Sequence, residues 1–348
     1  MKTASMTSGR LAKLVAGFSE AKVAVIGDFV LDKYYDLDPA RQKVSVESGK
    51  AAHQVVGIRH AAGCAGTIVN NLASLGCARI MAIGFCGDDG DGYELSRDLQ
   101  SVGCDITHLH KTARRVTPLY LKPRDVNDDT LSGELERFDI SNGSPTPPEV
   151  EDALIASLDA VLGEVDVISI MDQIDSPNHG VVTDRVRSAI AERAAACPGT
   201  IFWADSRRFI RHFRNVIIKP NPFELLGIDN PPPGTQFDDQ ELLNMARKHR
   251  QDYQTPLVLT RGAAGMWVSD PEWTEVPGVR IKGPVDSTGA GDSATAGAIS
   301  ALSAGASLVE AAVVANLVAS ITVQQIGKTG TARVDQLKAA RQAWIGKR

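Results

Sequence analysis

Short apolar runs that end in a polar residue recur along this chain, and they limit its possible folds more than any other feature. Three of them are 22–28 (KVAVIGD), 165–172 (VDVISIMD) and 199–207 (GTIFWADSR), each with an aspartate at or near its end. Segments with a helical spacing of apolar residues, such as 66–76 (GTIVNNLASLG), lie between such runs. Continuous apolar runs are typical of strands covered on both faces, and strand–helix alternation is typical of parallel sheets. The sequence therefore predicts an α/β fold with a mostly parallel sheet between two helical layers.

The predicted strands end in polar side chains. These residues are Asp28, Asp88, Asp172, Asp205, Asn221 and Arg261. The carboxyl ends of parallel strands meet at one edge of the sheet, and ligands bind at that edge. We therefore expect the six residues to lie on one rim, which is a candidate site.

Two segments interrupt the alternation. Residues 33–62 and 114–140 have the mixed polarity of exposed strands, and we expect them to form a small β lid on a single domain, residues 1–348. In a monomer these strands would leave an unpaired edge. Two lids paired across a two-fold axis would cover the edge, so we expect a homodimer.

The composition limits the kinds of binding partner and the cellular compartment that we expect for this chain. A net charge of −5 and a pI of 5.8 argue against nucleic acid as a partner. No apolar run approaches the ~20 residues that span a bilayer, so we expect no membrane partner. Five cysteines, an odd number without a CxxC pair, indicate reduced thiols in the cytoplasm.

The segment 286–292 (DSTGAGD) places an acid where a glycine-rich turn becomes a helix. Such a turn points backbone N–H groups at one spot, and the helix dipole adds to their attraction for an anion. Asp292 would lie in the first helical turn, where we expect it to be ionised at neutral pH. A carboxylate beside an anion site suits phosphoryl transfer to a hydroxyl, because the acid can accept the hydroxyl proton. The alternative is a tight loop followed by an ordinary first-turn acid.

Several motifs together resemble those of the PfkB family of carbohydrate kinases. The string DSTGAGDSATAG looks like the C-terminal signature of that family, and its other motifs are matched in order by VIGDFVLDKYY, GFCGDDGDG, KPNPFE and LTRGAAGM. The resemblance covers residues 20–340 and implies a ribokinase-like three-layer α/β/α fold. Within the family, GDFVLDKYY and ELERFDI look most like the heptose-phosphate kinase domain of lipopolysaccharide heptose synthesis.

The resemblance implies ATP-dependent transfer of the γ-phosphate to a hydroxyl of a sugar or sugar phosphate. Asp292 would be the general base, and the amides of Gly289, Ala290 and Gly291 would form the anion hole. Mg²⁺ would be held by Asn221 and Glu224, although KPNPFE could equally be the capped start of a helix. The residues implied to bind ATP are Thr260, Arg261, Gly262, Gly265 and Asn316. Asn316 could instead bond a neighbouring loop, and a monovalent cation such as K⁺ is implied near 326–331.

On the sugar side the chain departs from the family pattern. Asp28 and Asp32 would bond sugar hydroxyls, although Asp32 could be a solvated loop acid. After Gly63, the chain has Cys64 and Thr67 where the family signature has a second glycine and an asparagine. A cysteine side chain would intrude on the pocket floor, which leaves the acceptor open. The alternatives are a catalytically silent sugar or nucleotide sensor and a kinase of a nucleoside or vitamin alcohol.

A phosphorylated acceptor would need basic side chains near the rim or the lid. The available residues are Arg41, Lys43, Arg59, Arg137, Arg207 and Arg208. Arg207 and Arg208 follow a predicted strand end, so this pair is the best placed of the six.

Overall fold

A ten-stranded sheet forms the centre of the computed structural model, which describes residues 1–128, 130–229, 231–232, 234–327 and 329–345. From one edge to the other its strands are β1 (Lys2–Thr3), β16 (Trp273–Pro277), β15 (Gly265–Ser269), β14 (Leu257–Thr260), β13 (Ile217–Ile218), β12 (Ile201–Ser206), β11 (Val167–Asp172), β2 (Lys22–Gly27), β7 (Arg79–Gly87) and β8 (Asp105–Thr112). The strands from β14 to β8 run parallel, whereas β15 is antiparallel to both of its neighbours. The predicted α/β fold with a mostly parallel sheet is confirmed.

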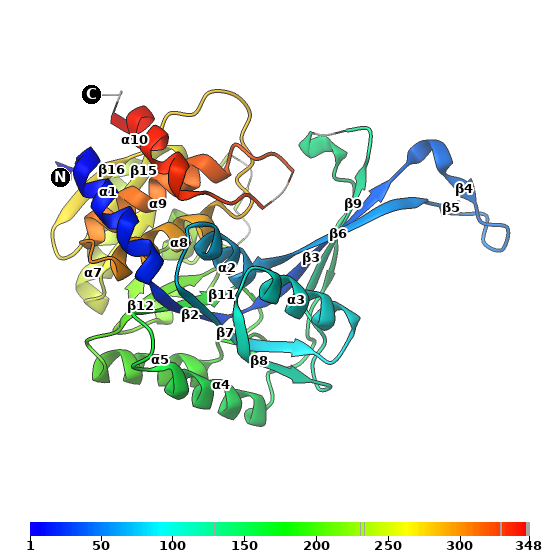
Figure 1. The fold of residues 1–348 in the computed structure, drawn as a ribbon, viewed down its shortest axis with the longest axis horizontal. Coiled ribbons are helices and arrows are strands. Elements are labelled where there is room, and N and C mark those ends of the chain that lie inside the picture. Colours follow the sequence, from blue (N-terminus) through cyan, green and yellow to red (C-terminus); the bar gives the residue numbers. More distant parts are fainter. Residues whose placement is uncertain (129, 230, 233, 328, 346–348) are drawn as a thin grey trace.

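Helices cover both faces of this sheet (Figure 1). One face packs against α1 (Ser8–Ala16), α2 (Ala65–Ser74), α3 (Gly90–Ser101), α8 (Ala290–Ser303), α9 (Leu308–Thr322) and α10 (Leu337–Ile345). The other face packs against α4 (Pro148–Val161), α5 (Asp184–Ala196), α6 (Pro222–Leu226) and α7 (Asp239–Tyr253).

The sequence of β2 shows why its apolar run is continuous. Val23 and Val25 belong to the core on the α8 side, and Ala24 and Ile26 belong to the core on the α4 side. Successive side chains of a strand point to opposite faces, so a strand covered on both faces must be apolar at every position.

A second, four-stranded sheet projects from the body (Figure 1). We call it the lid sheet; its strands, in order, are β10 (Phe138–Ile140), β9 (Leu119–Asp125), β3 (Phe29–Leu37) and β6 (Val55–Cys64). A short hairpin of β4 (Lys43–Val44) and β5 (Ala51–Ala52) lies at its far tip. Both segments predicted to form a lid contribute strands to it. β3 follows β2 after Asp28 alone, so the lid sheet begins directly at the carboxyl end of a central strand.

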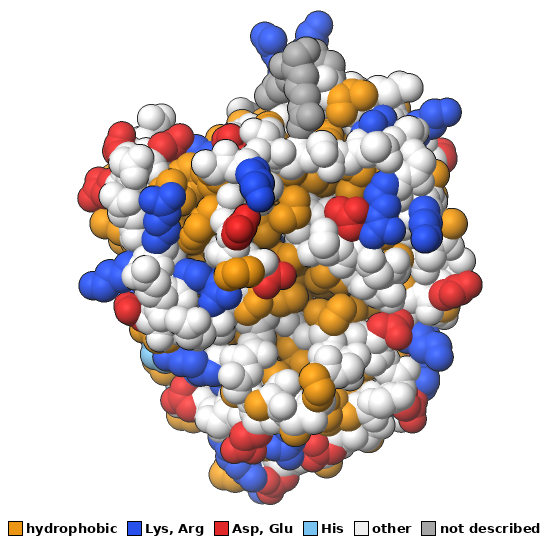
Figure 2. All heavy atoms as spheres, turned by 90° about the vertical axis from the view of Figure 1, so that its left-hand side faces the viewer, with side chains coloured by type: hydrophobic (Ala, Val, Ile, Leu, Met, Phe, Trp, Pro, Cys, Tyr) orange, Lys and Arg blue, Asp and Glu red, His pale blue; other side chains and the backbone are white. Residues whose placement is uncertain are grey.

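The surface, the cysteines and the helices each add an observation. Figure 2 shows hydrophobic side chains gathered in the middle of one face, with basic and acidic side chains interspersed around them. That face, as far as its residues are described, therefore has no continuous basic surface. All five cysteines are unpaired. No helix in the described ranges is long and apolar enough to cross a bilayer.

Candidate active site

The candidate residues at strand ends come together as the topology predicts. β2, β11, β12, β13 and β14 are parallel neighbours, so their carboxyl ends share one edge of the sheet. Asp172, Asp205, Asn221 and Arg261 lie at or just beyond these ends. This edge is the rim of the candidate site.

The turn before α8 has a backbone that requires glycine. Gly289 is the N-cap of α8 in the left-handed region, with φ +70°, and a Cβ there would lie 2.7 Å from the Thr329 methyl group. No side chain caps the helix, so its first turn can bond a ligand. The Ala290 amide already donates to the Ser287 carbonyl at 3.0 Å. This bond corrects the prediction of three free amides, because tightening the turn uses one of them.

Asp292 lies in the first turn of α8. It is buried, and the carboxylates of Asp205 and Asp32 lie near it, which the sequence did not indicate. Burial, followed by the negative charge of Asp205, raises its pKa from 3.8 to about 7, although Lys219 opposes this rise. The expectation of a fully ionised carboxylate at neutral pH is therefore wrong. A group with a pKa near 7 is well suited to accept and release a proton at neutral pH.

A buried ion pair joins Lys219, the first residue of the KPNPFE segment, to Asp205 in β12. Lys219 Nζ is 2.7 Å from Asp205 Oδ2, and less than a tenth of either side chain is exposed. Asp205 also accepts a bond of 3.3 Å from Thr295 Oγ1 of α8. The pair thus joins β12 and β13 to the helix that carries Asp292.

Asn221 and Glu224 form a capping box at the start of α6. Asn221 Oδ1 accepts the Glu224 N–H at 3.0 Å, and Glu224 Oε2 accepts the Asn221 N–H at 2.7 Å. The capped helix start, which the sequence left open, is therefore present. Burial and the charge of Asp205 raise the pKa of Glu224 to about 7.

A cavity of 710 Å³ adjoins the first turn of α8. Its walls are mainly apolar. Four of the residues predicted to bind ATP line it, together with two residues of the α8 start: Thr260, Gly262, Gly265 and Asn316, and Ala290 and Gly291. Asn316 also donates to the carbonyl of Pro277, the last residue of β16, at 2.8 Å, so its partner within the chain is a strand end and not the loop considered above. Arg261, which was predicted to bind ATP, does not line the cavity. Its guanidinium group pairs with Asp239, the first residue of α7, at 2.6 Å and lies 3.8 Å from the centre of the Trp267 ring.

Asp28, which the resemblance implied to bond sugar hydroxyls, has backbone amides of its own chain as partners. Oδ2 accepts the amides of Gln173 and Ile174 at 2.8 and 3.0 Å, and Oδ1 accepts the amide of Val181 at 2.7 Å. Burial, which outweighs these bonds, raises its pKa. Asp28 therefore anchors the segment 173–181, which follows β11.

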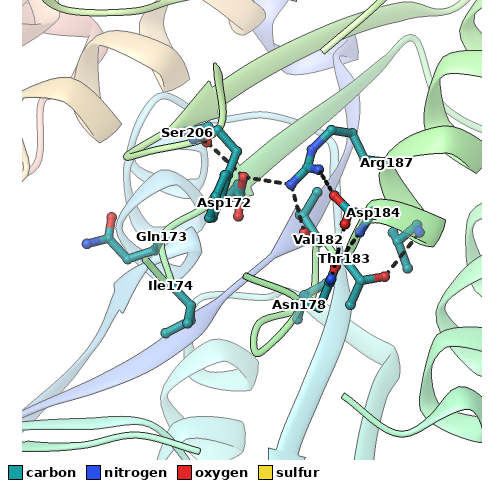
Figure 3. A network of polar contacts seen from close by, with 12 residues as sticks. Asp172, Gln173, Ile174, Asn178, Val182, Thr183, Asp184, Arg187 and Ser206 are labelled. Atoms are coloured by element: carbon teal, nitrogen blue, oxygen red, sulfur yellow. Dashed lines mark hydrogen bonds and ion pairs between the residues drawn. The ribbon is translucent and has the colours of Figure 1, made fainter. Parts of the chain in front are cut away.

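The base of the same segment is fixed by a second buried carboxylate (Figure 3). Asp172 Oδ2 accepts the Ser206 hydroxyl at 2.7 Å and lies 3.5 Å from Arg187, which also pairs with Asp184 at 2.7 Å. Burial and the charge of Asp28 raise the pKa of Asp172 to about 7. Gln173 points away from these contacts in Figure 3.

Asp32 on β3 is buried and pairs with Lys122 on β9 at 2.8 Å. The solvated loop acid is therefore not what the structure shows. Asp32 lies opposite Tyr120 in register, so Lys122, two residues on, shares its face of the lid sheet. A Cβ on Gly63 would overlap the Asp32 carboxylate, which explains a glycine at that position.

Cys64 occupies the N-cap of α2 with φ +53° and ψ −113°, a conformation that side chains other than glycine rarely adopt. Burial and the nearby charges of Asp292, Asp32 and Asp28 raise the pKa of its thiol. The side chain thus lies among the acids of the candidate sugar site, as the departure from the family pattern suggested. Thr67 is buried in the first turn of α2, where its methyl group would be 3.3 Å from a Cβ on Gly289.

A family model described as pfkB family carbohydrate kinase matches residues 20–334. The chain belongs to the pfkB family of carbohydrate kinases. Similar curated proteins include the bifunctional protein HldE of Caulobacter vibrioides, 31% identical over 325 residues, and that of Halorhodospira halophila, 30% identical over 332 residues. These alignments cover 91% and 93% of this chain but 63% and 64% of the relatives, so the chain spans less than two thirds of their length.

Solved structures of pfkB-like kinases share the fold. Phosphofructokinase-2 of Escherichia coli, in complex with substrates and products, has a TM-score of 0.69 at 18% identity, over 93% of this chain and 99% of that one. Ribokinase of Cryptococcus neoformans, in complex with ADP, has a TM-score of 0.60 at 18% identity, with the same coverage. The ribokinase-like architecture is therefore confirmed for this pfkB family member.

Sequence reasoning missed two lysines of this pfkB site. Lys219 stands at the end of the apolar run NVIIK, and a charge at the end of a buried strand was a usable signal. Lys122 lies in a strand of mixed polarity, where nothing in the sequence distinguishes it from an exposed lysine.

Proposed function

We propose that this carbohydrate kinase transfers the γ-phosphate of ATP to a hydroxyl of a sugar or sugar phosphate, as a single domain, residues 1–348, with the lid sheet over the acceptor. One observation carries the proposal. Asp292 stands in the first turn of α8, next to Gly291, which lines the 710 Å³ cavity, and near the side chains of Asp32 and Cys64. An apolar cavity of this size can hold a nucleoside, and its lining by Ala290 and Gly291 would place the phosphates at the helix start.

In this proposal each part of the α8 start has one task. The carboxylate of Asp292 accepts the proton of the acceptor hydroxyl as the oxygen attacks the γ-phosphorus. The amides of Gly289 and Gly291 and the helix dipole stabilise negative charge on the transferred group. Asp32 and Thr67 would face the acceptor, with Asp32 held in place by Lys122.

Magnesium would bind beside Glu224. No set of three His, Cys, Asp or Glu residues that could hold a metal occurs in the described ranges, so the protein alone does not form a complete cage. Glu224 still fits the ion: Asp205 repels its charge, and a divalent cation would relieve that repulsion. Mg²⁺ is commonly bound by one or two carboxylates, waters and substrate phosphates, and it neutralises phosphate charge. The segment implied for K⁺ includes residue 328, which lies outside the described residues.

The acceptor phosphate, where present, would meet Arg207. Of the six basic residues considered, Arg41, Arg59, Arg137 and Arg208 pair with nearby carboxylates, and Lys43 lies at the lid tip. Arg207 has no ion pair among the described residues. Its charge opposes the effect of burial on the pKa of both Tyr120 and Glu224, so it lies near the lid sheet and near the site. This position favours a sugar phosphate, with a heptose phosphate as the first compound to test.

The test is ADP release over a panel of sugars, sugar phosphates, nucleosides and vitamin alcohols, with wild-type protein and Asp292→Asn. We expect turnover with a sugar or sugar phosphate, a loss of about 10²-fold or more in the variant, and unchanged ATP binding by calorimetry. Asp252→Asn, on the exposed side of α7, is the matched control and should keep full activity. Undiminished turnover in Asp292→Asn would refute the base, and ligand binding without any ADP release would favour the sensor.

The cytoplasmic location inferred from the cysteines remains a prediction. So does the homodimer through the lid, which we retain as part of the proposal because both outer strands of the lid sheet expose apolar side chains.

A further inference from the structure

Lys219 is a buried cation that none of the predicted roles uses. It follows β13 directly, and its amide donates to the Ala204 carbonyl at 3.0 Å, so the residue is held beside β12. Its side chain is 5% exposed and Nζ lies 2.7 Å from Asp205 Oδ2. Lysine is almost never buried without a partner, so Asp205 accounts for its burial. Asp205 also accepts the bond from Thr295 of α8, so the ion pair lies against that helix.

The ammonium group lies next to the start of α8. Nζ is 3.5 Å from the point where a side chain on Gly291 would begin, and Gly291 lines the cavity. The positive end of a helix dipole repels a cation, so the carboxylates near Lys219 must offset this repulsion. No side chain caps the helix, so its first backbone amides are open to a ligand beside the ammonium group. The charges of Glu224 and Asp292 also act on Lys219, so three carboxylates and the helix start surround one ammonium group.

We propose that Lys219 is a catalytic residue whose ammonium group contacts the phosphate that is transferred, while Asp205 holds it in position. This inference rests on the proposed kinase function. In the transfer step, a bond forms between the acceptor oxygen and the γ-phosphorus, and the bond from that phosphorus to the β–γ bridging oxygen breaks. The electron pair of the broken bond stays on the ADP oxygen, and the hydroxyl proton passes to Asp292. Lys219 keeps all of its protons and donates hydrogen bonds to oxygens that gain charge.

The rival explanation is that Lys219 only neutralises Asp205. The two explanations differ for the double variant Asp205→Asn/Lys219→Met, which removes both charges and leaves no unpaired one. We expect the double variant to be at least about 10²-fold slower than Asp205→Asn alone, because it also lacks the contact to phosphate. Equal rates for these two variants would overturn the proposal. In Asp205→Asn the ammonium group of Lys219 still has the carboxylates of Glu224 and Asp292 nearby, whereas Lys219→Met alone would leave these carboxylates and Asp205 without their cation.

A binding measurement tests Lys219 without any turnover. Calorimetry compares the affinity for ADP with that for the non-hydrolysable triphosphate AMP-PNP, both with Mg²⁺. We expect the double variant to lose at least about tenfold in its preference for the triphosphate relative to Asp205→Asn, with ADP affinity unchanged. Lys248→Met, an exposed lysine on α7, is the control and should keep the wild-type ratio. An unchanged ratio in the double variant would refute the contact, even if every tested acceptor failed and the kinase function itself were rejected.

Discussion

At the scale of single residues, the raised pKa of Asp292 leads to predictions of how activity and stability depend on pH. Its pKa in the folded chain is about 7, against 3.8 as the reference value, so the folded state holds the proton up to higher pH than the unfolded chain. Its contribution to stability is therefore full below pH 4 and is lost as the pH rises through 7. Since the base proposed here must be ionised to act, we expect kcat/KM to fall below a pH of about 7 in wild-type protein.

The matching stability measurement uses Asp292→Asn at pH 5 and pH 8. The amide carries no charge to desolvate, so the variant should melt at a higher temperature than wild type, by about 2 °C or more at pH 8. The gain should be smaller at pH 5, where Asp292 is already protonated in the folded state. A gain that is equal at both pH values would show that the carboxyl group is not perturbed in this way.

Cys64 gives a second prediction at this scale. At φ +53° and ψ −113° its Cβ is strained, and strain of this kind costs about 1–3 kcal/mol. Cys64→Gly should therefore be more stable than Cys64→Ala, which removes the thiol but keeps the Cβ. Urea unfolding of the two variants measures the difference. If Ala proved the more stable of the two, the conformation at residue 64 would not be strained.

At the scale of elements, the segment 173–181 depends on Asp28. Its carboxylate accepts three amides, and Oδ1 would lie only 2.6 Å from a Cβ on Gly180. Asp28→Asn puts an NH₂ group against at least one amide donor, which should destabilise the protein by about 2–3 kcal/mol. Faster amide hydrogen exchange in 173–181 would show that the loss is local. Asp175→Asn, an exposed acid in the same segment, should change stability by no more than about 0.5 kcal/mol.

The same elements show what the sequence could predict. The strands, their direction and the rim follow from apolar runs, because a strand covered on both faces leaves a pattern along the chain. The roles of Asp28 and Arg261 could not be inferred, because both depend on partners far along the chain: the amides of 173–181 and the carboxylate of Asp239. The pairing of Asp205 with Lys219 could not be predicted for the same reason, because the two residues come together only when β12 and β13 pair.

At the scale of the whole molecule, the lid sheet predicts the oligomeric state. Its outer strand β6 exposes Val56 and Ile58, 47% and 58% accessible, and its other outer strand exposes Phe138 and Ile140. Outer strands with exposed apolar side chains can pair with a second copy of the chain. Pairing about a two-fold axis gives a closed dimer and leaves no free surface for further copies to add. Sedimentation equilibrium at micromolar concentration should therefore show a dimer.

The variant Val56→Asp/Ile58→Asp separates dimer formation from folding. Two carboxylates on the outer strand would be buried without partners in the dimer, so the variant should sediment as a monomer. Its melting temperature at low concentration should equal that of wild type, because both positions are exposed in the monomer. Val102→Asp, an exposed valine after α3 on the main body, should remain dimeric. A wild-type protein that is monomeric throughout the micromolar range would refute pairing through the lid, while the proposals for Asp292 and Lys219, which lie within one chain, would be unaffected.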